Sequence, residues 1–352
     1  MIQIDGAEGE GGGQMLRSAL TLSVITGRPI RMIHVRAGRL KPGLAPQHLA
    51  AVEAAATISH AHLEGAVLGS QSLVFEPRVL LPGEYRFDIG TAGAAPLVLQ
   101  TIALPLSFAE GDSRVSISGG THVPWSPCYH YLEWHWLHYM ERIGFPIQTT
   151  LEVAGFYPRG GGRMSASIQP ATSLSPLELT ERGPLRRIRG LSAVANLDLS
   201  IARRQERQAL RRLERHGVRI AMEVTQLPSR SKGTLLLLMA EFAHSQCCYY
   251  ALGEPGKPAE RVADEAVDAL EAFLATDAAV DAYLADQLIL PLSFVPGVSE
   301  LSTAKITSHL VTHTGIVKRF LPVEIEIIGE IGQPGQVRIK GVKHPKRGNR
   351  GS

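Results

Sequence analysis

The position of His309 suits a nucleophile. It follows Thr307 and Ser308 at the expected first turn of a helix that runs from His309 to Phe320. The positive end of a helix dipole disfavours imidazolium and attracts a phosphorus-bearing electrophile, so a neutral ring nitrogen there can attack phosphorus. A structural histidine is the alternative, and His313, one turn later, is a rival for the same role.

A glycine-rich segment at 8–14, EGEGGGQ, is the first candidate anion site, and Arg17 follows it within about one helical turn. Successive glycines let backbone N–H groups converge on a phosphate, and a following helix adds its positive dipole. A carboxylate in such a loop suits a bridging divalent cation, which makes Glu10 a candidate metal ligand. The spacing fits neither the P-loop nor the dinucleotide motif, and a glycine turn without a ligand is the alternative.

A second polar cluster lies between a turn and an expected helix start at Pro46. Two arginines three residues apart can each present a fork of donors to phosphate oxygens, and the helix start also attracts anions. Solvated surface is the alternative. The cluster consists of Arg36, Arg39, Lys41, Gln47 and His48.

The elements that must position these side chains indicate an α/β protein. Alternation of apolar and polar residues predicts strands at 2–4, 30–35, 85–89, 115–118 and 323–328. Apolar residues at helical spacing predict helices at 14–25, from Pro46 onward, at 96–108 and at 309–320. A strand, loop and helix recur in this order, without a strict sequence period.

Residues 183–276 differ in sequence pattern from the recurring units and are predicted to be an inserted small domain. This leaves 1–182 and 277–352 as the large domain. The insertion holds an arginine-rich helix within 203–219, a strand at 234–239 and a charged helix at 258–274. The arginines could contact a polyanion, as could the basic tail at 338–350; a solvated helix face and a frayed terminus are the alternatives.

The composition is that of a folded globular protein, with 44% hydrophobic and 20% charged residues. A formal net charge of +3 does not by itself mark a nucleic-acid binder. The three cysteines form no CxxC motif, which favours a reducing compartment. We expect a cytoplasmic protein, because neither a leader pattern nor an apolar run of membrane length is present.

Taken together, the motifs resemble those of the RNA 3'-terminal phosphate cyclase family, in matching order almost from end to end. The matching pieces are DGA at 5–7, EGGGQ at 10–14 with Arg17, RAGR at 36–39, KPGL at 41–44, QH at 47–48, GTAG at 90–93, QT at 100–101, GFYP at 155–158 with three glycines after Arg159, YLADQL at 283–288 and SHL at 308–310.

The resemblance implies an α+β fold of three repeated units, each a four-stranded sheet with two helices, and a small α/β domain inserted before the last unit. It also implies ATP-dependent conversion of an RNA 3'-phosphate to a 2',3'-cyclic phosphate. The expected intermediates are a covalent histidine–AMP adduct and an adenylated RNA 3'-end. The expected partners are RNA and ATP, and no membrane is expected. Whether the protein forms a homodimer is left open.

The resemblance also implies roles for individual residues. His309 would be the nucleophile, and Glu10 would bind Mg²⁺ or Mn²⁺. The residues expected to bind ATP are Gln100, Pro127, Tyr283, Asp286, Gln287, Arg17, Arg36 and Arg39. Those expected near the reacting phosphates are Gln47 and His48.

One segment departs from the family pattern. His122 stands where the family usually has Asn or Asp, and the aromatic residues between Trp125 and Trp136 could form core or stack on an RNA base.

Two other functions compete with cyclisation. A non-catalytic relative acting in ribosome assembly would lack the histidine, and an enolpyruvate transferase of similar architecture would need neither that histidine nor ATP.

Overall fold

The computed structural model describes residues 1–343. The chain begins with a mixed sheet in the order β1–β2–β4–β3, in which β1 and β2 are parallel and the other pairs antiparallel. Its strands are β1 (Ile2–Asp5), β2 (Ile30–Ile33), β3 (His62–Glu64) and β4 (Leu73–Glu76), and its helices are α1 (Gly13–Thr26) and α2 (Pro46–Ser59). Pro46 begins α2 because its fixed φ suits the first helical position, where no N–H is needed.

The second sheet has the order β5–β6–β8–β7, with β5 and β6 parallel. Its strands are β5 (Glu84–Asp88), β6 (Ser113–Gly119), β7 (Ile147–Val153) and β8 (Gly162–Ile168). Its helices are α3 (Ala95–Leu106), α4 (Tyr129–Tyr131) and α5 (Leu137–Ile143), with a π-helical turn η1 (Leu132–Trp136) between the last two.

The third sheet closes the chain in the order β15–β16–β14–β9, again with one parallel pair, β9 and β14. Its strands are β9 (Glu178–Leu179), β14 (Gly297–Thr303), β15 (Glu324–Ile328) and β16 (Gly335–Gly341), and its helices are α8 (Ala282–Leu292) and α9 (Ser308–Phe320). Thr307 caps α9, because its hydroxyl oxygen accepts the Leu310 N–H at 3.0 Å.

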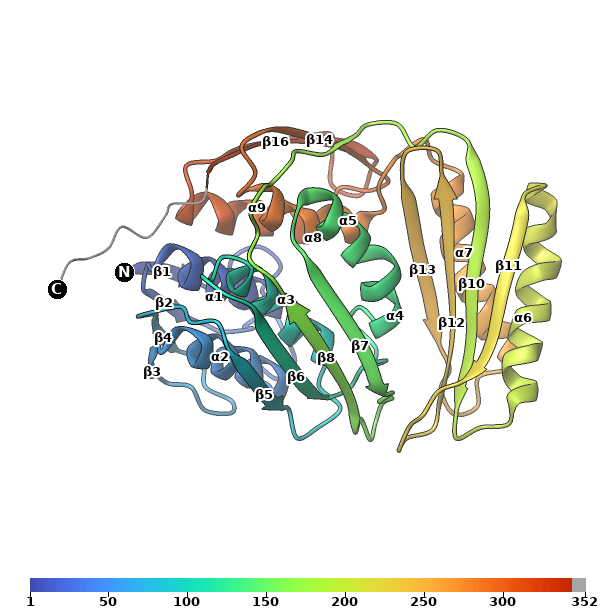
Figure 1. Cartoon of the computed structure of the whole chain (residues 1–352), viewed down its shortest axis with the longest axis horizontal. Coiled ribbons are helices and arrows are strands. Elements are labelled where there is room, and N and C mark those ends of the chain that lie inside the picture. Colours follow the sequence, from blue (N-terminus) through green and yellow to red (C-terminus); the bar gives the residue numbers. More distant parts are fainter. Residues whose placement is uncertain (344–352) are drawn as a thin grey trace.

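A fourth sheet lies within residues 183–276, in the order β11–β10–β12–β13. Its strands are β10 (Leu185–Ala195), β11 (Arg219–Gln226), β12 (Gly233–Phe242) and β13 (Gln246–Leu252). Its helices are α6 (Leu199–Leu213), a 3-10 turn η2 (Glu214–His216) and α7 (Ala259–Leu274). Figure 1 shows this sheet and its two helices at the right of the molecule.

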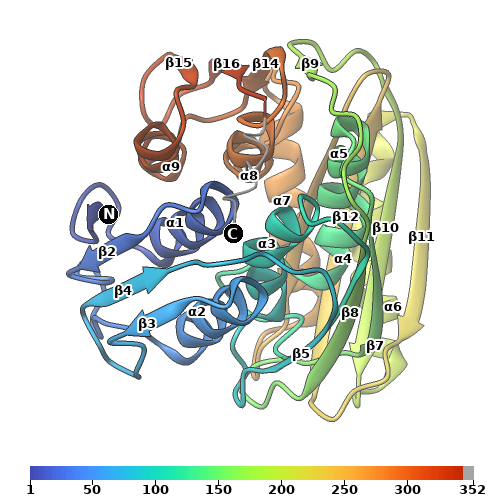
Figure 2. The same ribbon diagram turned by 60° about the vertical axis from the view of Figure 1, so that its left-hand side comes forward.

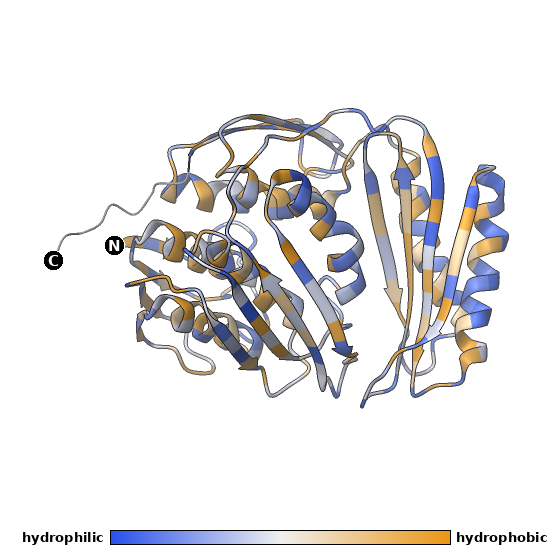
Figure 3. Cartoon of the chain, in the orientation of Figure 1, coloured by the Kyte–Doolittle hydropathy of each residue, from blue (hydrophilic) through white to orange (hydrophobic). Residues whose placement is uncertain are grey.

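The sheets surround a layer of helices, as Figure 2 shows for α1, α2, α3, α8 and α9. Helices covered on nearly every side must be apolar on nearly every face. Accordingly, 11 of the 12 residues of α3 are buried, and α1 buries a continuous run from Met15 to Ile25 interrupted only at Arg17. Figure 3 shows the contrast with α6, whose outward face is strongly hydrophilic.

The fourth sheet has two buried faces. Side chains such as Leu236 and Leu238 belong to a hydrophobic cluster with α6 and α7, whereas Leu235, Leu237 and Met239 belong to the main core. This explains why β12 is apolar without alternation, since a strand covered on both faces has no solvent side.

The expected elements are largely present, with two corrections. The arginine-rich helix ends at Leu213, because Gly217 adopts a left-handed conformation after η2 and Arg219 already begins β11. In the aromatic segment, Tyr129, Tyr131 and Trp136 are core residues, but Trp125 is 99% exposed.

In the basic tail, Arg338 contacts Glu300 and Lys340 contacts Glu324, and residues 344–350 lie outside the described residues. None of the helices within residues 1–343 is long and apolar enough to cross a membrane.

Candidate active site

His309 lies in the first turn of α9, against the first turn of α1 and the glycine-rich segment. Its Nδ1 is 2.7 Å from Glu10 Oε2 and 2.6 Å from Gln14 Oε1. Both oxygens are acceptors, so Nδ1 carries the hydrogen and, in the neutral ring, Nε2 carries the lone pair. The side chain is 47% exposed, which leaves it open to a substrate.

Gln14 joins His309 to Asp286 on α8. The Gln14 amide nitrogen donates to Asp286 Oδ1 at 2.7 Å, which orients its oxygen toward His309. His313 completes the group, with Nδ1 3.0 Å from the Asp286 backbone oxygen. The His313 side chain is only 5% exposed, so of the two rival histidines His309 is the accessible one.

The pKa of His309 is raised, contrary to the expectation of a helix dipole acting alone. The hydrogen bond to Glu10 is the main cause; burial opposes it, and the charges of Glu10 and Asp286 add to it. A contacting carboxylate outweighs the partial charge of a helix terminus. Glu10 therefore fixes which nitrogen is protonated and at the same time makes the ring more basic.

Two arginines neutralise this group of carboxylates. Arg39 donates to Glu10 Oε1, so both oxygens of Glu10 are engaged. Burial lowers the pKa of Arg17 to about 10, partly offset by Asp286 and Glu10, which leaves the guanidinium charged at neutral pH. Burial raises the pKa of Glu10, but the contacts with His309 and Arg39 outweigh it, and the net pKa is lowered.

His48 lies in the first turn of α2 and packs directly on the start of α1. A Cβ added at Gly13 would lie 2.1 Å from His48 Nε2, so only glycine permits this approach. Burial, with the charges of Arg17, Arg36 and Arg39, lowers the pKa of His48 to about 3. The ring is therefore neutral at any ordinary pH, and its buried Nδ1 has no partner in the described part of the chain.

Two more residues of this polar cluster, Arg36 and Gln47, bond to loop backbone. Arg36 donates to the backbone oxygens of Lys41 at 3.1 Å and Gly43 at 2.8 Å, so it shapes its own loop. Gln47 accepts the Ala94 N–H at 3.1 Å, at the start of α3. The starts of α1, α2, α3 and α9 are thus linked through side chains, which gathers several positive helix ends in one place.

The remaining predicted residues are partly assembled. Gln100 on α3 donates to Gln287 on α8 at 3.1 Å, one residue from Asp286. Tyr283, at the start of α8, is 65% exposed, and Pro127 is partly buried just before α4. Within residues 1–343, no hydrogen bond ties the side chain of Tyr283 to the His309 group.

Comparison with known proteins shows the family of the chain. The family model described as RNA 3'-terminal phosphate cyclase matches residues 8–327. RNA 3'-terminal phosphate cyclase of Ralstonia nicotianae is 44% identical over 94% of this chain and 94% of its own length. The chain belongs to the RNA 3'-terminal phosphate cyclase family. It is an enzyme of that family.

Two further relatives carry the same name. The cyclase of Caldivirga maquilingensis is 42% identical over 99% of this chain and all of its own length, and that of Trichormus variabilis is 42% identical over 91% and 94%. Among solved structures, the enolpyruvyl transferase NikO of Streptomyces tendae is 11% identical with a TM-score of 0.39. The match spans 97% of this chain and 48% of the transferase chain. A similarity at that level gives no support for a transferase.

Gln14 is a residue of the candidate site to which the sequence motifs assigned no role. It was visible only as the last residue of the EGGGQ motif. An amide suits this place, because one group must accept from His309 and donate to Asp286. The two groups that set this requirement, His309 on α9 and Asp286 on α8, are far from Gln14 in the sequence.

The described residues contain no cluster of three or more His, Cys, Asp or Glu side chains that could hold a metal ion. Among the carboxylates of the described residues, Glu10 is the one that contacts His309, and both of its oxygens are engaged. This donor set fits Mg²⁺ or Mn²⁺ only in the mode where one carboxylate is supplemented by substrate phosphate oxygens and water.

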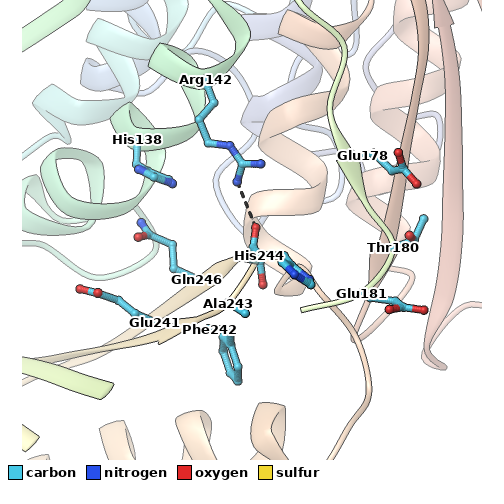
Figure 4. A pocket seen from close by; sticks show the side chains of 11 residues that line it. His138, Arg142, Glu178, Thr180, Glu181, Glu241, Phe242, Ala243, His244 and Gln246 are labelled. Atoms are coloured by element: carbon cyan, nitrogen blue, oxygen red, sulfur yellow. Dashed lines mark hydrogen bonds between the residues drawn. The ribbon is translucent and has the colours of Figure 1, made fainter. Parts of the chain in front are cut away.

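A cavity of about 780 Å³ lies away from this group, between α5, the β12–β13 turn and the segment after β9. Figure 4 shows Arg142 and His244 joined across it, through the His244 backbone oxygen. None of its lining residues was predicted for the active site.

Proposed function

We propose that this enzyme converts an RNA 3'-terminal phosphate to a 2',3'-cyclic phosphate at the expense of ATP, with His309 as the nucleophile. The observation that carries the proposal is the Glu10 carboxylate on His309 Nδ1, at 2.7 Å. It leaves the lone pair of the neutral ring on Nε2, and a neutral imidazole is both a competent nucleophile and a competent leaving group. The names of the relatives support the choice of RNA 3'-phosphate as substrate.

The reaction then has three steps. His309 Nε2 attacks the α-phosphorus of ATP, a P–N bond forms, and pyrophosphate leaves. An oxygen of the RNA 3'-phosphate attacks the same phosphorus, and the imidazole leaves. The adjacent 2'-hydroxyl attacks the RNA phosphorus, AMP leaves, and the proton of the hydroxyl passes to solvent. ATP is thereby split into AMP and pyrophosphate while one RNA phosphodiester ring closes.

Phosphoryl transfer of this kind depends on alignment and charge neutralisation. Arg17 and Arg39 are placed for the second task, because they already neutralise the carboxylates around His309. Arg36 would act mainly by holding its loop in shape. Glu10 would hold Mg²⁺ or Mn²⁺ together with phosphate oxygens; such an ion supplies positive charge to the triphosphate.

The adenylate would lie beside α8. We assign it the Gln100–Gln287 pair, Asp286, Tyr283 and Pro127. Asp286 bonds to Gln14 of the His309 group, and Gln287, which bonds to Gln100, is its neighbour in the chain. Gln47 and His48 would lie near the RNA phosphate. A neutral His48 suits that place, since it can donate a hydrogen bond without titrating.

We further propose that the first three sheets are repeated units of one large domain, 1–182 and 277–352, and that 183–276 is the inserted domain. In each of these three sheets the first strand along the chain lies at an edge and is parallel to its neighbour, which supports the repeats; in the fourth sheet the first strand, β10, is internal. The separate hydrophobic cluster around α6 and α7 supports the insertion.

The test is covalent labelling with ATP carrying a radioactive α-phosphate, in Mg²⁺ or Mn²⁺. Wild-type protein should retain acid-labile label, and His309→Ala should retain less than about a hundredth of it, because the nucleophile is gone. His62→Ala, which changes an exposed histidine outside the His309 group, should label normally. Equal labelling of wild type and His309→Ala would end the proposal.

A further inference from the structure

Four loops meet at one end of the molecule, where β5, β6, β7 and β11 end. Figure 1 shows these strand ends along its lower edge. We name the four loops together the loop rim; they are residues 89–94, 120–128, 154–161 and 227–232. The rim belongs to both the second and the fourth sheet, so it spans the junction of the two.

Backbone hydrogen bonds join each loop of the rim to the next. Gly120 N–H donates to Gly93 O at 2.7 Å, and His122 N–H donates to Gly155 O at 2.9 Å. Ala154 N–H donates to Pro228 O at 2.7 Å. The four loops therefore form one connected surface.

The rim exposes a tryptophan. Trp125 is 99% exposed and has a φ of +64°, which is a strained conformation for a bulky side chain. The loop around it is fixed, because the Tyr250 hydroxyl donates to Ser126 O and Tyr129 N–H donates to Thr121 O at 2.8 Å. Because the indole is held in solvent, its apolar surface does not stabilise the core, and the ring is available to stack on a ligand.

The rim is also basic. It contains Arg159, Arg230 and Lys232 and no Asp or Glu, and all three cations are exposed. None of the three forms an ion pair within residues 1–343. Arg230 lies beside the three glycines at 160–162, since its Cβ is 3.9 Å from a Cβ built at Gly161. Tyr157, 66% exposed, adds a second aromatic ring in the same loop as Arg159.

The rim adjoins the proposed active site through the start of α3. Gln47, next to the buried His48, accepts the N–H of Ala94 at the end of the first rim loop. Gly160 packs on that same loop, with its added Cβ 2.7 Å from Ala92 Cα. A chain leaving the phosphate site beside Gln47 would pass directly onto the rim.

We propose that the loop rim binds the single-stranded RNA that leads to the reacting 3'-end, with Trp125 as a stacking platform for a base and the three cations on its phosphates. Exposed aromatic residues interleaved with unpaired cations suit single-stranded nucleic acid. The proposal rests on the proposed function and adds to it where the RNA lies.

The arginine-rich helix α6 is less suited to this role. Arg204 pairs with Glu260, and Arg212 with Asp264, both on α7. Two of the five arginines of α6 are therefore neutralised within the protein. Three of its arginines, Arg203, Arg207 and Arg211, have no ion pair in the described residues and supply a matched control.

The test is the binding of a ten-nucleotide single-stranded RNA with a 3'-phosphate, measured by fluorescence anisotropy at several salt concentrations. Changing Arg159, Arg230 and Lys232 to Gln should weaken binding and reduce the slope of log Kd against log salt by about 2, at about 0.7 per phosphate. Changing Arg203, Arg207 and Arg211 to Gln should leave the slope unchanged. An unchanged slope in the rim variant, or an equal loss in the α6 variant, overturns the proposal.

Trp125 is tested separately. Trp125→Ala should bind the same RNA about tenfold more weakly, and Trp125→Phe should recover most of the loss, because a ring still stacks. Equal binding by wild type and Trp125→Ala contradicts the platform. Labelling of the wild type by ATP without RNA separates the two proposals. An unlabelled wild type removes the proposed function, whereas a labelled wild type with rim variants that bind normally removes only the rim.

Discussion

At the scale of single residues, the decisive contact is the one between Glu10 and His309. It fixes the protonated nitrogen as Nδ1, and it raises the pKa of the ring, which in the proposed reaction must be neutral to attack. The two effects oppose each other near neutral pH, because a more basic nitrogen is a better nucleophile but is protonated for more of the time. The pH dependence of labelling reports this balance.

Glu10→Gln should move the rising limb of the pH–rate profile for self-adenylation to lower pH. The pKa of His309 is raised in the wild type, so the neutral fraction of the ring grows only as pH rises through that raised pKa. Without the Glu10 carboxylate the pKa is lower, and the neutral fraction grows at a lower pH. Glu8→Gln is the control, since Glu8 pairs with Arg319 instead. A limb that stays in place in Glu10→Gln would show that another group titrates.

Gly13→Ala tests the contact between Gly13 and His48. The new methyl would fall 2.1 Å from His48 Nε2, so His48 or the helix start must shift, at a cost of about 1–3 kcal/mol in the free energy of unfolding. Gly315→Ala on α9 meets nothing within 4 Å and should stabilise by about 0.5–1 kcal/mol. Urea unfolding measures both, and a neutral Gly13→Ala would contradict the contact.

At the scale of elements, α6 and α7 are held together by charge as well as by their apolar faces. Arg212 reaches Asp264, Asp268 and Glu271 from one side chain that is 25% exposed. These contacts raise the pKa of Arg212 against the effect of its partial burial. Without the guanidinium, three carboxylates would face one another.

Arg212→Met should therefore cost about 1–2 kcal/mol in the free energy of unfolding at low salt, from lost attraction and new repulsion. The loss should shrink as salt rises, because both terms are screened. Arg211→Met, which removes only a contact with Gln208, should change stability by less than about 0.5 kcal/mol. A salt-independent loss in Arg212→Met would point to packing in place of charge.

At the scale of the whole molecule, a buried polar contact joins three parts of the chain. His135 in η1 and Asp281 at the start of α8 are fully buried, with Nε2 and Oδ2 2.7 Å apart. The other oxygen of Asp281 caps α8 by accepting the Tyr283 and Leu284 N–H groups. Gln246 of β13 donates to the backbone oxygen of Trp134 beside them at 2.8 Å.

His135→Phe should lower the free energy of unfolding by about 2–4 kcal/mol, because Asp281 Oδ2 would stay buried without a donor. Asp281→Asn should cost less, since an amide can still cap α8 and donate to His135. His138→Phe, at an exposed position on α5, is the control. Equal midpoints of urea unfolding for His135→Phe and His138→Phe would contradict the role of the pair.

The sequence alone determined the local elements and the residue types that carry chemistry. Thr307 and Ser308 before His309 predicted a helix start, and the structure begins α9 at Ser308. Pro46 likewise marked the start of α2, and core was one of two alternatives for the aromatic segment, of which Tyr129, Tyr131 and Trp136 are buried. These predictions hold because caps and periodicity act within a few residues.

Only the tertiary structure decided which distant residues meet. Gln14 and His309 are 295 positions apart, and Gln100 and Gln287 are 187 apart. The direction of the His309 pKa shift also depends on such a contact, since Glu10 comes from the other end of the chain. A local pattern records which face of a helix is apolar; it does not record which helix will cover that face, so the partners of His309 follow only from the packing of α1 against α9.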